Sequence, residues 1–167
     1  MPEIYKIATL NINDMATPPR IAMLVFDDIR GFTAYTNIGT TGRGTAILTR
    51  DHIQLTNIVC LPTGRGMATQ FQNVTIENIY APSGAERMRD KETFFSNELP
   101  YLLRDIPPSL LVGGDFSCVL TNIDATGHPN YSRALQEFIR GFDLLDTWEI
   151  PGARYLYPLH QSGSLED

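Results

Sequence analysis

The run Val74-Thr75-Ile76-Glu77-Asn78-Ile79-Tyr80 leads directly into Ala81-Pro82-Ser83-Gly84. Apolar and β-branched residues bounded by Pro, Ser and Gly are typical of a strand that ends in a turn. Four earlier runs have the same character and are predicted as strands: Ile4–Asn11, Gly44–Arg50, His52–Leu61 and Met67–Phe71. The glycine-rich stretches at 41–44 and 62–66 predict that several of these strands are antiparallel neighbours.

After Gly84 the spacing of apolar residues changes to that of a helix. A helix is predicted over residues 86–105, with Pro100 marking a kink or the start of a second short helix. Leu110–Val112 is predicted as a short buried strand that ends in Gly113-Gly114-Asp115. A further helix is expected from the N-cap Ser132 to Gly141. This order favours an α/β fold, a two-sheet α/β sandwich with mainly antiparallel strands and flanking helices.

Length and composition predict one domain spanning residues 1–167. The chain has 167 residues, 43% of them hydrophobic, and a domain of this size buries roughly 70% of the surface exposed when unfolded. Its two cysteines lack the spacing of a disulfide framework or a zinc finger. The longest apolar run, Ile21–Phe26, is too short to cross a bilayer, so we expect an intracellular protein without a membrane partner.

The charge distribution is uneven. The net charge is −6; residues 1–90 carry eight acidic and eight basic residues, while residues 91–167 carry eleven acidic and five basic ones. An acidic chain is unusual for a nucleic-acid binder. Eleven of the thirteen basic residues are Arg, whose planar guanidinium suits phosphate. Charge alone therefore leaves open both an ordinary solvated surface and a phosphate ligand.

Three polar residues stand at the ends of predicted strands: Asn11, Tyr80 and Asp115. Each alone is common in turns or at the edge of a core. Together, rigidly held oxygen atoms at one edge of a sandwich can bind a hard cation such as Mg²⁺.

In order along the chain, Thr9–Asn13, Asn78–Pro82 and Gly114–Ser117 resemble motifs of the endonuclease/exonuclease/phosphatase superfamily. The likeness is greatest to the endonuclease domain of non-LTR (LINE-type) retrotransposons. Gly44–Leu48 resembles a core strand of that domain, and Ala134–Trp148 resembles the helix and strand after its Gly-Asp-Phe-Asn motif. The resemblance extends from about Ile4 to Tyr157.

The resemblance implies metal-dependent phosphodiester hydrolysis, with DNA as partner, Mg²⁺ or Mn²⁺ as cofactor and a nuclear location. Asn11 and Asp115 would hold the metal, and Asp115 would also orient or deprotonate the attacking water. Tyr80 would donate a hydrogen bond to a phosphate oxygen. Phosphate or DNA contacts are predicted for Asn78, Ser83 and Ser117.

The chain departs from the family between Leu24 and Val25. The rest of the first helix and the second strand with its Gln-Glu metal-binding pair are missing there, and Val25–Phe32 resembles the loop that follows that strand. We expect an internal deletion. Asp27 and Asp28 are the nearest acids, but as loop residues they are poor replacements for the missing glutamate.

Three further departures also concern the site. Ser117 stands where the family has Asn, and Leu156 stands where related endonucleases have Thr. The sequence reaches Ser162–Asp167 without an Ile-Asp pair or a Ser-Asp-His motif, and none of its three histidines follows an aspartate in the required context. The expected C-terminal truncation thus removes the Asp-His pair that would hold the base.

These departures predict weak metal binding and strongly impaired turnover, because a positioned acid or base contributes roughly 10²–10⁴ in rate. Missing strands also expose sheet edges, which favours self-association and low stability. Two alternatives stay open: a non-catalytic remnant or module that binds nucleic acid or protein, and a superfamily phosphatase or phosphodiesterase acting on a small or lipid phosphate. Asn78–Pro82 favours the nuclease over the phosphatase.

Overall fold

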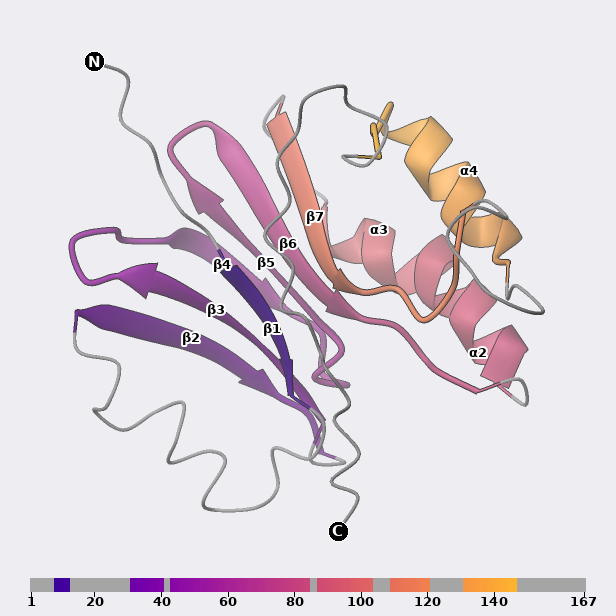
Figure 1. Ribbon diagram of the computed structural model, residues 1–167, viewed down its shortest axis with the longest axis horizontal. Helices are drawn as coiled ribbons and strands as arrows, with labels where there is room; N and C mark the ends of the chain where they lie inside the picture. The colour runs from indigo at the N-terminus through magenta and orange to yellow at the C-terminus, as the bar shows by residue number, and fades with distance from the viewer. Residues whose placement is uncertain are drawn as a thin grey trace, which may run out of the picture.

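Two β-sheets, with helices beside one of them, form the described part of the chain (Figure 1). The computed structural model describes residues 8–12 (backbone only), 31–40, 43–84, 87–103, 109–120 and 131–146. The first sheet has the order β1-β3-β2, made of Ala8–Ile12, Gly44–Arg50 and Phe32–Ile38. The second has the order β4-β5-β6-β7, made of Thr56–Cys60, Gly66–Phe71, Val74–Tyr80 and Ser109–Asp115.

The strand pairs are antiparallel except for β6 and β7, which are parallel. Parallel neighbours need a crossover connection rather than a tight turn, and the helical segment between Tyr80 and Ser109 supplies it. As a result β6 and β7 both end at the same edge of the second sheet.

Side chains of the second sheet alternate between two apolar cores. Ile76 and Met67 lie with Ile47 in the core between the two sheets. Ile79 and Ala68 belong to the other set of alternating side chains, and they pack with the helices on the opposite face of the second sheet. Figure 1 shows the same layering, with the second sheet between the first sheet and the helices. Both faces of β6 are therefore buried, as in the middle layer of a sandwich.

Two buried asparagines link the two sheets through hydrogen bonds to backbone carbonyls. Asn37 Nδ2 donates to the carbonyl oxygens of Leu61 and Gly66, at 3.1 and 2.8 Å. Asn78 Nδ2 donates to the carbonyl oxygen of Ala46 at 2.7 Å. Buried amides persist where they are hydrogen-bonded, so these bonds fix how the two sheets are placed.

The predicted helix over residues 86–105 is broken into three parts. Helix α2 (Met88–Thr93) passes into a π-helical turn (Phe94–Glu98) and then helix α3 (Leu99–Leu102). The Leu99 N–H donates to the Phe94 carbonyl, five residues back. Pro100 stands in the first turn of α3, and because it lacks an N–H it cannot donate a hydrogen bond back into the π-helical turn. The prediction of a second short helix at Pro100 is thus confirmed.

Helix α4 (Arg133–Gly141) begins where it was predicted to begin. Ser132 Oγ accepts from the Leu135 N–H at 3.1 Å, which is the N-cap expected of a serine in extended conformation. Glu92 of α2 accepts from the Ala134 N–H at 2.8 Å. The start of α4 is therefore held by α2 as well as by its own cap.

Two strand predictions need correction. Phe32–Ile38 is strand β2, although its first residue was assigned to a loop and the rest was not predicted as a strand. Polar residues at Thr33, Thr36 and Asn37 interrupt its apolar residues, and only Asn37 is buried, so its apolar signal is weak. The strand predicted over His52–Leu61 is shorter, because only Thr56–Cys60 pairs with β5.

Several sequence predictions lie outside the described residues. They concern the inferred deletion between Leu24 and Val25, the acids Asp27 and Asp28, Leu156, and the C-terminal stretch Ser162–Asp167. In the described ranges, no helix has the length and apolar character that a bilayer crossing requires.

Candidate functional site

Tyr80 and Asp115 stand side by side at the ends of two parallel strands. In the β6–β7 register Tyr80 is opposite Asp115, and the Ala81 N–H donates to the Asp115 carbonyl at 2.8 Å. Residues opposite one another in a sheet share a face. Ile76 and Asn78, in phase with Tyr80, meet the first sheet, so both predicted catalytic residues lie on the face toward that sheet.

Asn11 lies on β1 of the first sheet, and this strand passes close to β6 and β7. Asn11 is opposite Thr45 in the β1–β3 register, and Thr45 precedes Ala46, the residue that accepts the hydrogen bond from Asn78. Strand β1 also contacts both β6 and β7. Three segments distant in sequence therefore meet at one place, while the roles predicted for their side chains stay predictions.

Asp115 begins a tight turn that is closed by Ser117. The N–H and the Oγ–H of Ser117 both donate to Asp115 Oδ1, at 2.8 and 3.0 Å. Ser117 has a φ of 51°, in the left-handed region that Asn adopts more readily than Ser. The asparagine that the resemblance places here would therefore suit this backbone at least as well.

Tyr80 is held by a buried arginine. Arg65 Nη1 donates to the Tyr80 carbonyl at 3.0 Å, and its Cζ lies 5.1 Å from the centre of the Tyr80 ring. The Tyr80 N–H in turn donates to the Arg65 carbonyl at 2.7 Å. Burial lowers the pKa of the Arg65 guanidinium from its ordinary value, and repulsion from Arg43 lowers it further.

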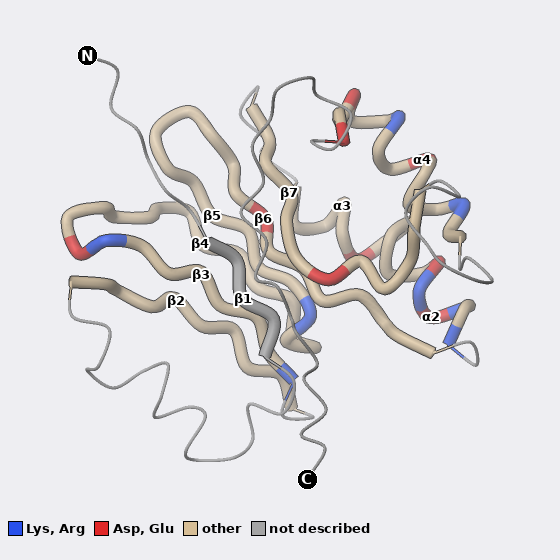
Figure 2. The backbone as a smooth tube through the Cα atoms, in the orientation of Figure 1, with Lys and Arg blue, Asp and Glu red and all other residues tan. Residues whose placement is uncertain are grey.

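Acidic and basic residues both lie near the end of β7. Figure 2 shows an acidic position at the end of β7, with basic positions toward the same end of the molecule and in α2. Lys91 of α2 donates to the Ser117 carbonyl at 2.6 Å. The turn that carries Asp115 thus lies beside a buried cation.

The predicted phosphate contacts differ in their surroundings. Asn78 is fully buried and its Nδ2 is engaged by Ala46, whereas Ser83 is exposed just past the end of β6. Ser117 directs its donors to Asp115. Phosphate binding by any of the three stays a prediction.

Oxygen-bearing side chains on β3, β6 and β7 are the candidates for holding a magnesium ion in this region. Within the described ranges, Asn78 Oδ1 and Thr45 Oγ1 are buried without a hydrogen-bond partner. Magnesium takes oxygen ligands and is often held by only one or two carboxylates together with water and substrate phosphate. The described residues contain no cluster of three or more His, Cys, Asp or Glu that could hold a metal, so within them Asp115 and neutral oxygens would have to hold the ion.

Glu77 cannot serve as the missing metal-binding glutamate. It is fully buried, and neither carboxylate oxygen has a partner among the described residues. Burial raises the pKa of this carboxyl to about 8. It alternates with Asn78 along β6 and therefore lies on the opposite face of the sheet, toward the helices.

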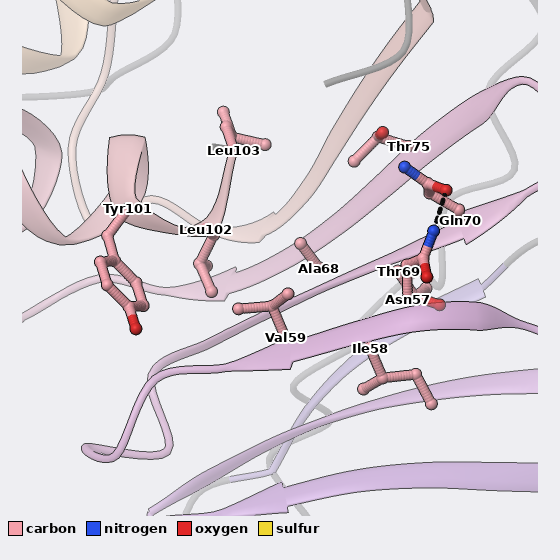
Figure 3. Close-up of a pocket in the computed structure, with 10 residues that line it drawn as sticks. All are labelled: Asn57, Ile58, Val59, Ala68, Thr69, Gln70, Thr75, Tyr101, Leu102 and Leu103. Carbon is pink, nitrogen blue, oxygen red and sulfur yellow. Dashed lines mark hydrogen bonds between the residues drawn. The ribbon is translucent and has the colours of Figure 1, made fainter. Parts of the chain in front are cut away.

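The cavity in Figure 3 is separate from these residues. It has a volume of about 450 Å³ and lies between strands β4 and β5 and helix α3. Asn57 Nδ2 donates to Gln70 Oε1 at 2.6 Å on one side of the cavity, and Tyr101 lies on the opposite side (Figure 3). None of the predicted site residues lines it, so it is not the candidate catalytic site.

Sequence reasoning missed three buried charged residues in this region: Arg65, Glu77 and Lys91. A signal existed for Lys91, which stands three and four residues before Phe94 and Phe95 and so shares the buried side of the helical segment. Arg65 stands between two glycines in a turn, where exposure is the ordinary expectation. Nothing in the sequence around Glu77 indicated that its side chain is buried.

Solved structures share this fold at low sequence identity. An AP endonuclease from Archaeoglobus fulgidus is 17% identical, with a TM-score of 0.52 over 66% of this chain and 51% of that one. A humanized D. rerio TDP2 carrying 14 mutations is 15% identical, with a TM-score of 0.51 over 70% of this chain and 50% of that one. No family model and no curated protein matches the chain.

The chain has a mixed α/β, two-sheet fold like that of these two structures. It spans about half the length of the solved structures it matches. At this level of identity the likeness establishes the fold, and the fold alone does not establish a function.

Proposed function

We propose that this chain is a divergent DNA endonuclease domain of the retrotransposon type, with metal-dependent phosphodiester hydrolysis strongly impaired. The observation that carries the proposal is the pairing of Tyr80 with Asp115 at the ends of β6 and β7. The motif order in the sequence supports the same assignment, and so does the superfamily fold. DNA as the partner and a nuclear location are part of the proposal.

In this proposal each residue has a distinct task. Asp115 orients or deprotonates the attacking water, and its Oδ1 is fixed by the two donors of Ser117. The Tyr80 hydroxyl donates to a phosphate oxygen, and the hydrogen bond from Arg65 to the Tyr80 carbonyl holds the backbone of this residue in place. The chemistry that a divalent cation supplies at such a site is neutralisation of phosphate charge.

The impairment follows from the number of carboxylates. Glu77, the nearest buried acid along β6, faces the helices, so it adds no negative charge to the site. As far as the described residues go, a cation would then rely on Asp115, on neutral oxygens and on the substrate. We therefore expect weak metal binding and slow turnover.

A plasmid-nicking assay with Mg²⁺ or Mn²⁺ tests the proposal. Asp115→Asn keeps an oxygen acceptor for Ser117 but removes the charge, so metal-dependent nicking is expected to fall by about 10²–10⁴. The matched control is Asp90→Asn, an exposed acid in α2, which should nick like the parent. Nicking that survives Asp115→Asn, or that persists in EDTA, would contradict the assignment.

A non-catalytic binding module is the second candidate, and the β4 edge favours it. All five residues of β4 are exposed, and in the described part of the chain β4 pairs only with β5. Exposed strands with free backbone groups favour pairing with another chain. If the chain never nicks DNA but forms dimers that disappear when Val59→Lys places a charge on this edge, the binding module is the better account.

A further inference from the structure

Lys91 is a buried cation with a specific backbone partner. Its side chain is 1% exposed, and its Nζ donates to the Ser117 carbonyl at 2.6 Å. It is one of only two lysines in the chain. Burying an ammonium group is costly unless it is well hydrogen-bonded, so a lysine in this position requires a compensating contact.

The carbonyl that Lys91 binds belongs to the residue that fixes Asp115. Ser117 is in the left-handed region, with a φ of 51°, and this conformation sends both its N–H and its Oγ–H to Asp115 Oδ1. Left-handed backbone is unfavourable for a residue other than Gly. A donor on the Ser117 carbonyl offsets that cost and fixes the plane of the following peptide.

Helix α2 is anchored well enough to hold this turn. The next residue, Glu92, accepts from the N-terminus of α4 at Ala134, at 2.8 Å. Phe95, in the π-helical turn, stacks on Phe116 with ring centres 6.4 Å apart. Phe116 lies between Asp115 and Ser117, so helix and turn are joined on both sides of the Lys91 contact.

We propose that Lys91 is a positioning residue that fixes the Asp115–Ser117 turn in the geometry needed for metal and phosphate binding. The effect on metal and phosphate binding rests on the proposed function. The effect of Lys91 on the conformation of the turn can be measured independently of it. Arg65 provides a parallel on the neighbouring strand, where a buried guanidinium donates to the carbonyl of Tyr80. Both predicted catalytic strand ends are thus held by buried cations.

Removing Lys91 should change metal affinity in opposite directions for a positioning role and for a purely electrostatic role. Lys91 and Asp115 both act electrostatically on Cys118, so they share one neighbourhood. If Lys91 acted only as a charge, removing it would strengthen the binding of a cation, because like charges repel. If Lys91 positions Asp115, removing it weakens binding.

The experiment measures Mn²⁺ affinity by electron paramagnetic resonance for the full chain and for Lys91→Met, which keeps the length of the side chain without its charge. We expect affinity to fall by about fivefold or more. Lys91→Arg, which keeps a buried donor, should restore most of it. Affinity that is unchanged or higher in Lys91→Met would overturn the proposal.

Amide hydrogen exchange provides the second readout. In Lys91→Met the Ser117 amide is expected to exchange at least about tenfold faster, with Leu135 in α4 unchanged. Asp90→Asn is the matched control, because Asp90 is an exposed acid one residue before Lys91 in α2 and its substitution should leave Mn²⁺ affinity and exchange at Ser117 as they are. If Lys91→Met does not fold, Lys91→Gln replaces it with the same expected direction.

The two readouts distinguish the two proposals. If the parent chain binds no Mn²⁺ while Lys91→Met speeds exchange at Ser117, the proposed function is wrong and Lys91 still holds the turn. If the parent binds Mn²⁺ and Lys91→Met changes neither affinity nor exchange, the positioning role is wrong. Faster exchange with unchanged affinity also overturns it, because the turn would then not matter to the site.

Discussion

Glu77→Gln is expected to raise the free energy of unfolding by about 3 kcal/mol at pH 7. Burial raises the pKa of the Glu77 carboxyl from 4.5 to about 8, so the folded protein keeps a proton that the unfolded chain releases. Neutral glutamine has the same shape and removes this difference. The free energy of unfolding from urea titrations of both proteins measures the effect.

The pH dependence has a definite sign. Between pH 4.5 and about 8 the folded state binds one proton more at Glu77 than the unfolded state does, so this residue lowers stability as pH rises. The advantage of Glu77→Gln should therefore be near zero at pH 4.5, grow through pH 7 and level off above pH 8. A difference that does not change with pH would contradict the burial of this carboxyl.

Glu137→Gln is the control for the Glu77 experiment. Glu137 also lies in a regular element, but its side chain is 56% exposed, and in the described part of the chain it pairs with exposed Arg133. Surface ion pairs contribute about 0–1 kcal/mol. Glu137→Gln should therefore change stability little and show no comparable dependence on pH.

Gly114→Ala is expected to destabilise the fold by more than about 3 kcal/mol and to abolish any metal-dependent activity. Gly114 has a φ of 129°, a conformation that side chains rarely allow. A Cβ there would overlap the Ile79 carbonyl oxygen and would lie 2.9 Å from Asn78 Oδ1. Since Ile79 and Asn78 belong to β6, the substitution would separate β6 from β7 at the site.

Gly141→Ala is the matched control for Gly114. A Cβ added at Gly141, in the last turn of α4, meets nothing within 4 Å. Alanine in a helix is favoured over glycine by about 1 kcal/mol, so this change should be neutral or slightly stabilising. Thermal melting monitored by circular dichroism checks both variants, and equal melting temperatures would contradict the close contact at Gly114.

Much of the fold was predictable because it depends on local signals. The turn around Pro62–Gly66 precedes β5 as its glycines indicate, and Ser132 caps α4. The parallel pairing of β6 with β7 was not predicted, although the helical spacing between the two predicted strands is the usual sign of a parallel crossover. Yet this pairing is what brings Tyr80 and Asp115 together.

The residues that support the site were less predictable, because their burial depends on tertiary contacts. β6 is covered on both faces, so polar Glu77 and polar Asn78 are both buried while facing opposite ways. Lys91 and Arg65 are charged residues whose ordinary place is the surface. Their hydrogen bonds to Ser117 and Tyr80 become visible only once the chain is folded.

Paramagnetic broadening by Mn²⁺ tests most directly the claim that three strand ends form one metal site. At low Mn²⁺ the backbone amide signals of Asn11, Tyr80 and Asp115 should weaken together, while those of distant strand β4 stay sharp. Broadening centred on Asp143 and Asp146, two acids that follow α4, with Asn11 and Tyr80 unaffected, would contradict the claim.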